Sequence, residues 1–431
     1  MKFHSLNDPK LQTSFREAVI AGIAPDRGLY FPQNIKALPK DFFENIESLS
    51  PQQIAFAAIH QFVGEDIPDG ALRDILAKTL DFGFPLVELQ DDVAVLELFH
   101  GPTMAFKDVG ARFMANSLGY FSQGEKQEVT VLVATSGDTG GAVANGFLGV
   151  PGVKVVILYP SGKVSEIQEK QLTTLGSNIE AMEVQGSFDD CQEMVKTAFL
   201  DPQITARRKL TSANSINVAR WLPQMFYFLF AYARAKEKGR EIVFSVPSGN
   251  FGNLCAGMLA QRLGMPVKHF IAATNVNDVV PRFLGDGNYS PLPSKATISN
   301  AMDVGDPSNF VRIRRLYRDD LPTLRANLSS HSFTDALTRE AIREVYEKTS
   351  YVMDPHGAVG YLGLREHQKS HPGTYGIFLE TAHPVKFLDV VEGTLGLELP
   401  IPPQIQKVMG GQKKSIPIAG YGDLREYLLG Q

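Results

Sequence analysis

The chain of 431 residues has few cysteines and no long apolar run. Cys191 and Cys255 are its only cysteines. They are too few for a disulfide framework and lack neighbours at metal-ligand spacing, so no metal site is expected and a reducing compartment is favoured. The longest apolar stretch, residues 221–233, is too short to span a bilayer and contains Pro223. Because the N-terminus also lacks the apolar segment of a signal peptide, we expect a cytoplasmic protein that does not enter a membrane.

The chain also lacks an excess of positive charge. Its 42 lysines and arginines and 47 aspartates and glutamates give a formal net charge of −5 at pH 7. A nucleic-acid-binding domain needs a basic stripe, so nucleic acid is not an expected partner. The contents of 44% hydrophobic and 21% charged residues are those of an ordinary globular protein. The length allows two or three domains, each with its own core.

Two patterns of secondary structure follow one another along the chain. Residues 1–80 show helical spacing and one short strand, which predicts a small, mainly helical cap without catalytic residues. From about residue 93 onward, strands and helices alternate. This alternation predicts an α/β fold with parallel sheets and right-handed crossovers. From Leu399 the tail is rich in proline and is expected to wrap over the surface. The clearest predicted strands are 128–136, 154–160, 178–186, 241–247, 267–275 and 374–380.

The stretch 241–264 is the one around which the chain is organised. A nearly continuous apolar strand is followed by SGNFGN, residues 248–253, and then by a helix. Gly249 and Gly252 allow the backbone to curl, so that its N–H groups and the start of the helix can converge on one anion. The loop is neither a Walker A loop nor a dinucleotide-binding GxGxxG motif. Taken alone, it is better explained as an ordinary glycine-rich turn.

Lys107 lies in a helix predicted over residues 103–121. The residues three, four and seven positions further on are small or apolar, so only Asp108 could pair with its ammonium group. A lysine removed from water has a lowered pKa and more free amine, which suits nucleophilic chemistry. Taken alone, a side chain that extends past the apolar face to water explains Lys107 better.

Three further segments carry groups that could bind anions or a ring. Ser136, Gly137 and Thr139 follow the strand at 128–135 and suit a carboxylate, although helix capping by Ser136 or Asp138 explains the loop equally well. The other two segments lie at residues 212–220 and 381–384. The first contributes Ser215, Asn217 and Arg220, which suit a phosphate, although helix capping and a surface arginine explain them slightly better. The second contributes Thr381, whose hydroxyl could bond a ring nitrogen.

Together these segments resemble the threonine synthase family of enzymes that use pyridoxal phosphate (PLP). The resemblance extends over most of the chain, through LELFHGPTMAFKDVGARFMA, TSGDTGGAV, SANSINVAR, VPSGNFGN and ETAHPVKF. It implies PLP fold type II, the tryptophan-synthase-β-like fold, with two open parallel-sheet α/β domains and an N-terminal cap. The implied division is an N-terminal domain at 1–80 and a PLP-binding catalytic region at 81–431, with a smaller mobile subdomain at about 110–215.

The resemblance also implies a role for each of these residues. Lys107 occupies the position of the family's Schiff-base lysine, and Thr381 that of the hydroxyl residue at the pyridine nitrogen. Many relatives carry asparagine where Asp138 stands, so its contact with the ring O3′ is not assigned. Three sets of residues complete the implied site: Gly249, Asn250, Phe251, Gly252 and Asn253 for the PLP phosphate; Ser136, Gly137, Asp138 and Thr139 for the substrate carboxylate; and Ser215, Asn217 and Arg220 for the substrate phosphate.

The implied reaction is conversion of O-phospho-L-homoserine and water to L-threonine and phosphate, the last step of threonine biosynthesis. It would make the chain a carbon–oxygen lyase acting on a phosphate ester, as a monomer or homodimer. The alternatives of the same fold type are a serine or threonine dehydratase, a cysteine synthase, and a phospho-lyase that forms 2-oxobutyrate from the same substrate. Spacing does not separate synthase from phospho-lyase, but the extent of the resemblance favours synthase. Lys107 and the complete SGNFGN loop argue against a non-catalytic amino-acid sensor. The absence of a Walker A loop and of an acidic metal pair argues against a kinase.

Overall fold

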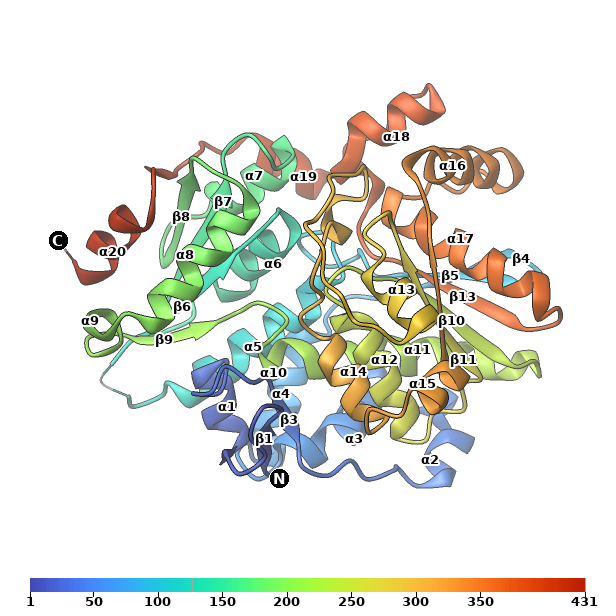
Figure 1. Cartoon of the computed structure of the whole chain (residues 1–431), viewed down its shortest axis with the longest axis horizontal. Coiled ribbons are helices and arrows are strands. Elements are labelled where there is room, and N and C mark those ends of the chain that lie inside the picture. The colour runs from blue at the N-terminus through green and yellow to red at the C-terminus, as the bar shows by residue number, and fades with distance from the viewer. Residues whose placement is uncertain (126, 431) are drawn as a thin grey trace.

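Two sheets of mainly parallel strands, each covered by helices, form the body of the protein (Figure 1). The structure is a computed structural model that describes residues 1–125 and 127–430. In Figure 1, β6 to β9 lie on one side and β5, β10, β11 and β13 on the other. The first helices and strands of the chain lie below them. The predicted α/β architecture with two parallel sheets and an N-terminal cap is therefore confirmed.

The larger sheet has the strand order β12-β11-β10-β13-β5-β4, and only the β4–β5 pair is antiparallel. Strands β10 and β13 are buried along their whole length, as their mainly apolar sequences predict. Helix α17 packs against β10, β11 and β13, and α16 packs on α17. The strands and these two helices are β4 (Leu86–Gln90), β5 (Val93–Glu97), β10 (Ile242–Pro247), β11 (His269–Thr274), β12 (Leu328–Ser332), β13 (Tyr375–Glu380), α16 (Asp335–Thr349) and α17 (Pro355–Ser370).

The smaller sheet has the order β14-β8-β7-β6-β9, with every neighbouring pair parallel. Helices α5 and α6 pack against each other, α6 also contacts α7, and α8 contacts β6 and β7. The elements are β6 (Val129–Ala134), β7 (Val153–Pro160), β8 (Ile179–Val184), β9 (Lys209–Ser212), β14 (Ile416–Ile418), α5 (Lys107–Phe121), α6 (Asp138–Phe147), α7 (Glu166–Thr173) and α8 (Phe188–Leu200).

The N-terminal unit contains a small antiparallel sheet, β2-β1-β3, in addition to the predicted helices. Helix α1 contacts β9, α3 contacts α11, and α4 contacts α5, so this unit touches both α/β bodies. Phe31 stacks on Trp221 with ring centroids 5.8 Å apart, within a core that continues into both bodies. The elements of this unit are β1 (Phe3–Ser5), β2 (Gln12–Thr13), β3 (Tyr30–Pro32), α1 (Phe15–Ala21), α2 (Lys40–Glu44), α3 (Pro51–Val63) and α4 (Asp69–Thr79).

The C-terminal tail does more than wrap over the surface, so that prediction was wrong for its last part. Strand β14 pairs with β8, and Leu424 and Leu428 of α20 are buried in the core of the smaller sheet. Strand β14 is difficult to predict because it has only three residues and contains Pro417. The proline is tolerated because β14 is an edge strand. The remaining helices are α9 (Pro202–Thr205), α10 (Val218–Trp221), α11 (Met225–Ala235), α12 (Gly252–Arg262), α13 (Val279–Asp286), α14 (Phe310–Leu316), α15 (Leu321–Asn327), α18 (Leu388–Leu395), α19 (Pro403–Met409) and α20 (Tyr421–Leu429).

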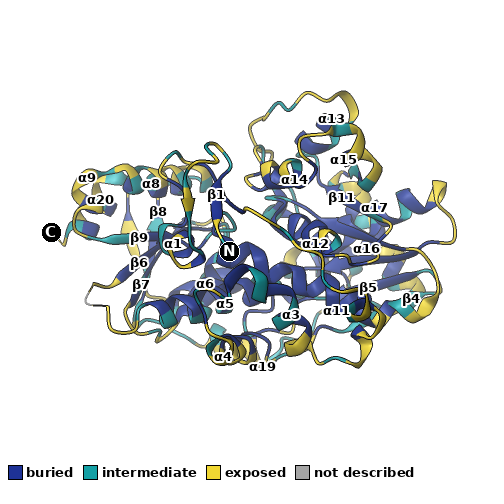
Figure 2. Cartoon of the chain, turned by 90° about the horizontal axis from the view of Figure 1, so that it is seen from below, coloured by how far each residue is buried: buried dark blue, intermediate teal, exposed yellow. Residues whose placement is uncertain are grey.

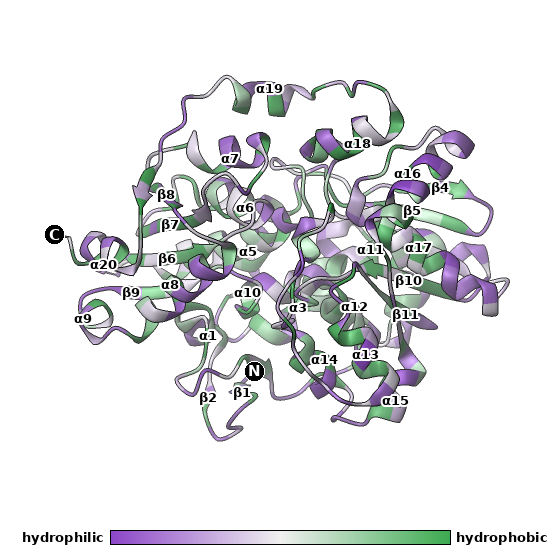
Figure 3. Ribbon diagram, turned by 45° about the horizontal axis from the view of Figure 1, so that its top comes forward, coloured by the Kyte–Doolittle hydropathy of each residue, from purple (hydrophilic) through white to green (hydrophobic). Residues whose placement is uncertain are grey.

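The most buried helices lie between the sheets and carry the apolar stretches of the sequence. In Figure 2 helices α5 and α12 are largely dark blue, whereas the loop that follows α13 is mostly exposed. Figure 3 shows hydrophilic residues concentrated on outer helices such as α16 and α20. Helix α11, from the stretch 221–233, is buried almost throughout, as predicted. Across the described residues, no helix combines the length and apolarity needed to cross a membrane.

Candidate active site

The SGNFGN loop connects the end of β10 to the start of α12. Phe251 adopts φ 60°, a left-handed conformation that is rare for a bulky residue and marks a constrained loop. The N-cap residue Phe251 makes no side-chain cap, and in the first turn the Leu254 N–H donates to Asn253 Oδ1 at 2.8 Å. The N–H groups of Gly252 and Asn253 are left to bind an anion. The Asn253 side chain closes the loop by donating from Nδ2 to the Pro247 carbonyl at 2.9 Å.

Both glycines of this loop are needed for close packing. A Cβ on Gly249 would lie 2.7 Å from the Ala301 carbonyl oxygen and 2.9 Å from the Met302 Cα, closer than backbone atoms tolerate. A Cβ on Gly252 would lie 3.3 Å from the Ser215 Cβ. The loop therefore has no room for a side chain at Gly249, and a side chain at Gly252 would fit only tightly.

Asn309, for which the sequence predicts no role, fixes the SGNFGN loop by hydrogen bonds. Its backbone N–H and its Nδ2 both donate to the Asn250 carbonyl at 3.1 Å, and Nδ2 also donates to Ser215 Oγ at 3.0 Å. The Ser308 hydroxyl donates to Asn250 Oδ1 at 3.2 Å. Ser215 therefore lies beside the SGNFGN loop. Asn309 ends the segment SNAMDVGDPSN, residues 299–309. No strand was predicted directly before this segment, so the sequence could not place Asn309 beside the loop.

Lys107 and Thr381 are brought together by the backbone. Helix α5 begins at Lys107, four residues later than predicted, because the preceding segment is bound to the chain after β13. Ala105 forms an antiparallel bridge with Ala382, and the Phe106 N–H donates to the Thr381 carbonyl at 2.8 Å. Lys107 is thus the first residue of a helix that starts directly beside Thr381.

The charges around Lys107 differ from those expected from sequence. Burial, the largest cause, lowers the pKa of Lys107 to about 8; Asp138 opposes this change, and the positive charges of Arg220 and Lys386 add to it. Asp108, the expected partner, instead accepts hydrogen bonds from the Thr103 N–H at 2.9 Å and the Thr103 hydroxyl at 2.5 Å. The amine of Lys107 is therefore poised for proton transfer near neutral pH.

This environment predicts an unusual titration of Lys107. In PLP-free protein, its amine should react with an acylating reagent with a midpoint near pH 8, because above that pH the amine is neutral and below it is protonated. Pulsed acetylation followed by peptide mass spectrometry measures the midpoint, with the exposed Lys268 as an internal reference. A midpoint at the ordinary lysine value of about 10.5 would contradict this description of the site.

The Ser136–Thr139 loop follows β6 and begins α6. Gly137 has φ 133°, and Thr135 Oγ1 accepts from the N–H groups of Gly137 at 2.9 Å and Gly140 at 2.8 Å. Capping by Ser136 or Asp138, the alternative left open by the sequence, is therefore not what the structure contains. Ser136 and Thr139 are half-buried and keep their hydroxyls available to a ligand.

Asp138 is buried in an ion pair with Lys386, a residue the sequence analysis did not single out. Asp138 Oδ1 lies 2.6 Å from Lys386 Nζ and accepts from Gln168 Nε2 at 3.0 Å. Burial alone would raise the pKa of Asp138, but the charges of Lys386 and Lys107 and these hydrogen bonds hold it well below the usual range. The available signal was a lysine between two apolar residues in ETAHPVKF, directly after a buried strand.

Asn217 and Arg220 are both buried, and they differ in whether a hydrogen-bond donor is left free to bind a ligand. Asn217 Oδ1 caps α10 by accepting from the Ala219 N–H at 3.0 Å, and Nδ2 donates to the Val19 carbonyl at 2.9 Å and the Ser212 carbonyl at 3.1 Å. Its amide hydrogens are thus used by the fold, and we do not retain Asn217 as a substrate ligand.

Arg220 is 3% exposed, so the alternative of a surface arginine is wrong. Its Nη1 donates to the Ala213 carbonyl, while its Nε has no hydrogen-bond partner among the described residues. Burial lowers the pKa of Arg220 to about 10, so the group remains cationic at neutral pH. It supplies a buried positive charge with spare donor capacity, as an anion site requires.

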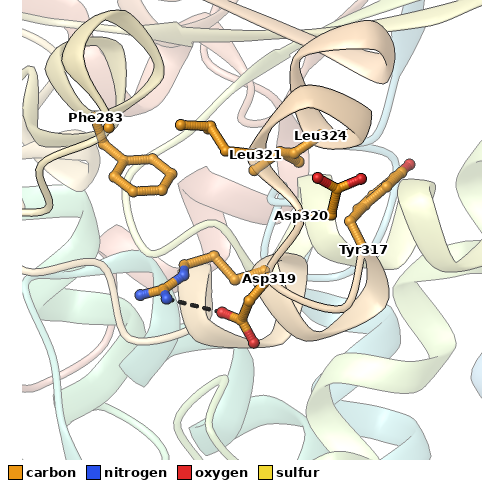
Figure 4. A pocket seen from close by; sticks show the side chains of 8 residues that line it. Phe283, Tyr317, Asp319, Asp320, Leu321 and Leu324 are labelled. Atoms are coloured by element: carbon orange, nitrogen blue, oxygen red, sulfur yellow. Dashed lines mark ion pairs between the residues drawn. The ribbon is translucent and has the colours of Figure 1, made fainter.

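A separate surface hollow lies between α13, α14 and α15 (Figure 4). The Phe283 ring and the Arg314–Asp319 ion pair, 2.8 Å long, line it. None of its lining residues belongs to the segments around Lys107. It is not part of the candidate active site.

Comparison with known proteins agrees with this arrangement. Family models match in three parts: "Threonine synthase N terminus" over residues 2–80, "Pyridoxal-phosphate dependent enzyme" over 84–379 and "Threonine synthase, C-terminal" over 357–426. The chain belongs to the threonine synthase family. A threonine synthase of Serratia marcescens is 44% identical over 440 residues, which cover 100% of this chain and 99% of that protein.

Two solved threonine synthase structures match this chain over its whole length. The crystal structure of the Escherichia coli threonine synthase has a TM-score of 0.94 at 44% identity, covering 100% of both chains. The PLP-bound threonine synthase from Brucella melitensis has a TM-score of 0.93 at 33% identity, covering 100% of this chain and 99% of that one. Like the rest of this family, the chain is a PLP-dependent enzyme. The uncapped start of α12, the crowded Gly249 and the amine of Lys107 fit this cofactor.

Proposed function

We propose that this chain converts O-phospho-L-homoserine and water to L-threonine and phosphate. The observation that carries the proposal is the position of Lys107. Lys107 begins helix α5 beside Thr381, and the charges of Asp138, Arg220 and Lys386 act on its amine. The family match along the entire chain supports the same activity.

The residues proposed to hold PLP come from three segments. Lys107 would bind it covalently, and the backbone of Gly249 to Asn253 with the start of α12 would donate to its phosphate. Thr381 would place a neutral hydroxyl at the ring nitrogen, which does not enforce a positive charge there. Bound PLP supplies an electron-accepting ring that stabilises negative charge next to the substrate's amino-bearing carbon.

Lys107 would then act as the base. Its Nζ would take the α-proton of the substrate and later move a β-proton. A pKa near 8 leaves a useful fraction of the amine unprotonated at neutral pH, and the conjugate acid can return the proton. The γ-carbon would lose phosphate and take up a proton to become the methyl group. The β-carbon would take the hydroxyl of water, and a proton would return to the α-carbon to give threonine.

The substrate's two anionic groups require separate sites. The hydroxyls and amides of Ser136, Gly137 and Thr139 are proposed to hold the α-carboxylate, at the positive end of α6. Arg220 is proposed for the departing phosphate, because its buried guanidinium has an unused donor. Ser215 lies beside the SGNFGN loop, which favours a role near the PLP phosphate instead.

Replacing Arg220 by methionine should weaken substrate binding while PLP stays bound. A hydrogen bond to a charged group contributes about 1.5–3 kcal/mol, so we expect KM to rise about 10- to 100-fold. Steady-state kinetics measure KM, and the visible absorbance of the protein reports bound PLP. The surface variant Arg282→Met is the matched control. An unchanged KM in Arg220→Met would remove Arg220 from the substrate site.

Simultaneous measurement of both products tests the proposed reaction. Purified protein with PLP is incubated with O-phospho-L-homoserine, and phosphate, threonine and 2-oxobutyrate are measured together. Phosphate with equimolar threonine supports the synthase. Phosphate with 2-oxobutyrate would instead make the protein a phospho-lyase. A PLP-binding protein that releases no phosphate would be assigned to the dehydratases or cysteine synthases.

We further propose a cytoplasmic monomer or homodimer. Both cysteines are buried and free, which suits a reducing compartment. The division at residue 80 and the mobility of a subdomain at about 110–215 also remain proposals. The strands of the smaller sheet come from residues 129–212 and 416–418.

A further inference from the structure

Lys386 is a completely buried lysine that no proposed step uses. Its side chain has no exposed surface, and it follows β13 in a short helical turn, Pro384–Phe387. Burying an ammonium group is costly unless it is paired and hydrogen-bonded. The contacts of Lys386 are therefore specific, and they point to what it does.

Lys386 connects the two loops that lie on either side of Lys107. Its Nζ lies 2.6 Å from Asp138 Oδ1, in the Ser136–Thr139 loop, and donates to the Thr103 carbonyl at 3.0 Å, in the segment leading to Lys107. Two glutamines of α7 bond to the same two oxygens. Gln168 donates to Asp138 Oδ1 at 3.0 Å, and Gln171 donates to the Thr103 carbonyl at 3.1 Å.

We propose that Lys386 is a positioning residue for Lys107: it neutralises Asp138 and holds the Ser136–Thr139 loop against the segment that precedes Lys107. A purely structural pair would not need to lie here, since an apolar pair of similar volume is often at least as stable as a buried ion pair. The inference rests on the proposed role of Lys107 as the reacting amine.

The charge balance at Lys107 explains why the pairing matters. Asp138 on α6 attracts a proton to Lys107, whereas Arg220 on α10 and Lys386 repel one. On α5 itself, the Asp108 carboxylate is turned to Thr103, and the Tyr227 hydroxyl of α11 donates to the Phe106 carbonyl. Without Lys386, the negative charge of Asp138 would have Lys107 as its remaining cationic partner. Lys107 would then stay protonated to higher pH.

A single and a double substitution at Lys386 and Asp138 test the proposal. The variants are Lys386→Met and Asp138→Asn/Lys386→Met. The matched control is Lys413→Met, which removes a lysine whose Nζ lies 2.8 Å from Glu183 Oε2. The pH midpoint of Lys107 acetylation is measured in PLP-free protein. The visible absorbance of PLP-loaded protein is followed against pH as a second readout.

In Lys386→Met the midpoint should move to higher pH, and the labelling rate of Lys107 at pH 7 should fall about tenfold for each unit of that shift. The double variant should return to the wild-type midpoint, because no unpaired carboxylate remains, and Lys413→Met should not move it. A Lys386→Met protein that is less heat-stable but has the wild-type midpoint would overturn the proposal and leave Lys386 a structural residue.

A Lys386→Met chain that does not fold leaves two variants to decide. Lys386→Arg keeps the charge, and the double variant removes both charges, so each should retain a midpoint within about half a unit of wild type. A larger shift in the double variant would overturn the proposal. The labelling experiment needs neither PLP nor substrate. If the midpoint does not shift as predicted while the wild-type protein forms threonine, this inference is refuted and the proposed function stands.

Discussion

Replacing Lys107 by alanine should abolish threonine formation, with a loss of more than about 10³-fold in kcat/KM. The change removes the only proposed base and the proposed covalent anchor of PLP together. Among the described residues, the Lys107 side chain makes no hydrogen bond that the substitution would remove. The visible absorbance of PLP joined to the protein should disappear as well. Product formation and absorbance spectra measure the two effects.

The matched control for this substitution is Lys268→Ala, which removes an exposed lysine paired with Glu241 at 2.7 Å. It should leave activity and spectrum unchanged. Thermal unfolding of both variants separates a lost reaction from a lost fold. Turnover within tenfold of wild type in Lys107→Ala would overturn the assignment of Lys107.

Gly249→Ala should strongly weaken PLP binding. The new methyl group would lie 2.7 Å from the Ala301 carbonyl oxygen and 2.9 Å from the Met302 Cα, so the backbone of the loop must shift. Such a shift would misalign the amides that we propose to bind the cofactor phosphate. Each hydrogen bond to a charged group contributes about 1.5–3 kcal/mol, so we expect the PLP dissociation constant to rise about 10- to 100-fold. Titration of PLP-free protein with PLP measures this constant.

Gly285→Ala is the control for Gly249→Ala, because a Cβ at that helical position meets no atom within 4 Å. It should bind PLP as wild type does and be slightly more stable, since alanine has the higher helix propensity. Equal PLP affinity in the two alanine variants would show that the SGNFGN loop does not hold the cofactor.

The sequence was sufficient to predict the parts of the fold whose signal is local. The apolar run that forms β10 is continuous and β-branched, and the glycine-rich loop after it breaks the strand where the structure does. Strand β12 was missed because its sequence, LSSHS, is polar and obtains its place only by pairing with β11. Strand β14 was missed for a similar reason, since its pairing with β8 joins distant parts of the chain.

The charge balance of the site could not be predicted, because it depends on contacts between distant segments. Asp108 is next to Lys107 in sequence, but its carboxylate bonds to Thr103. Asp138 resembles a helix-capping residue in sequence, but its partner is Lys386, which comes after the last strand of the larger sheet. The sequence left Asn217 open as a helix cap or a phosphate ligand, and its side chain caps α10 and bonds the Val19 and Ser212 carbonyls.

The most direct test of the central claim is to find which amine holds PLP. Reduction of the PLP-loaded protein with borohydride fixes the cofactor to that nitrogen, and peptide mass spectrometry locates it. We predict that the added mass is on Lys107 alone, although Lys386 is also a buried lysine close enough to influence its charge. Modification of Lys386, or of any other lysine in place of Lys107, would contradict the account.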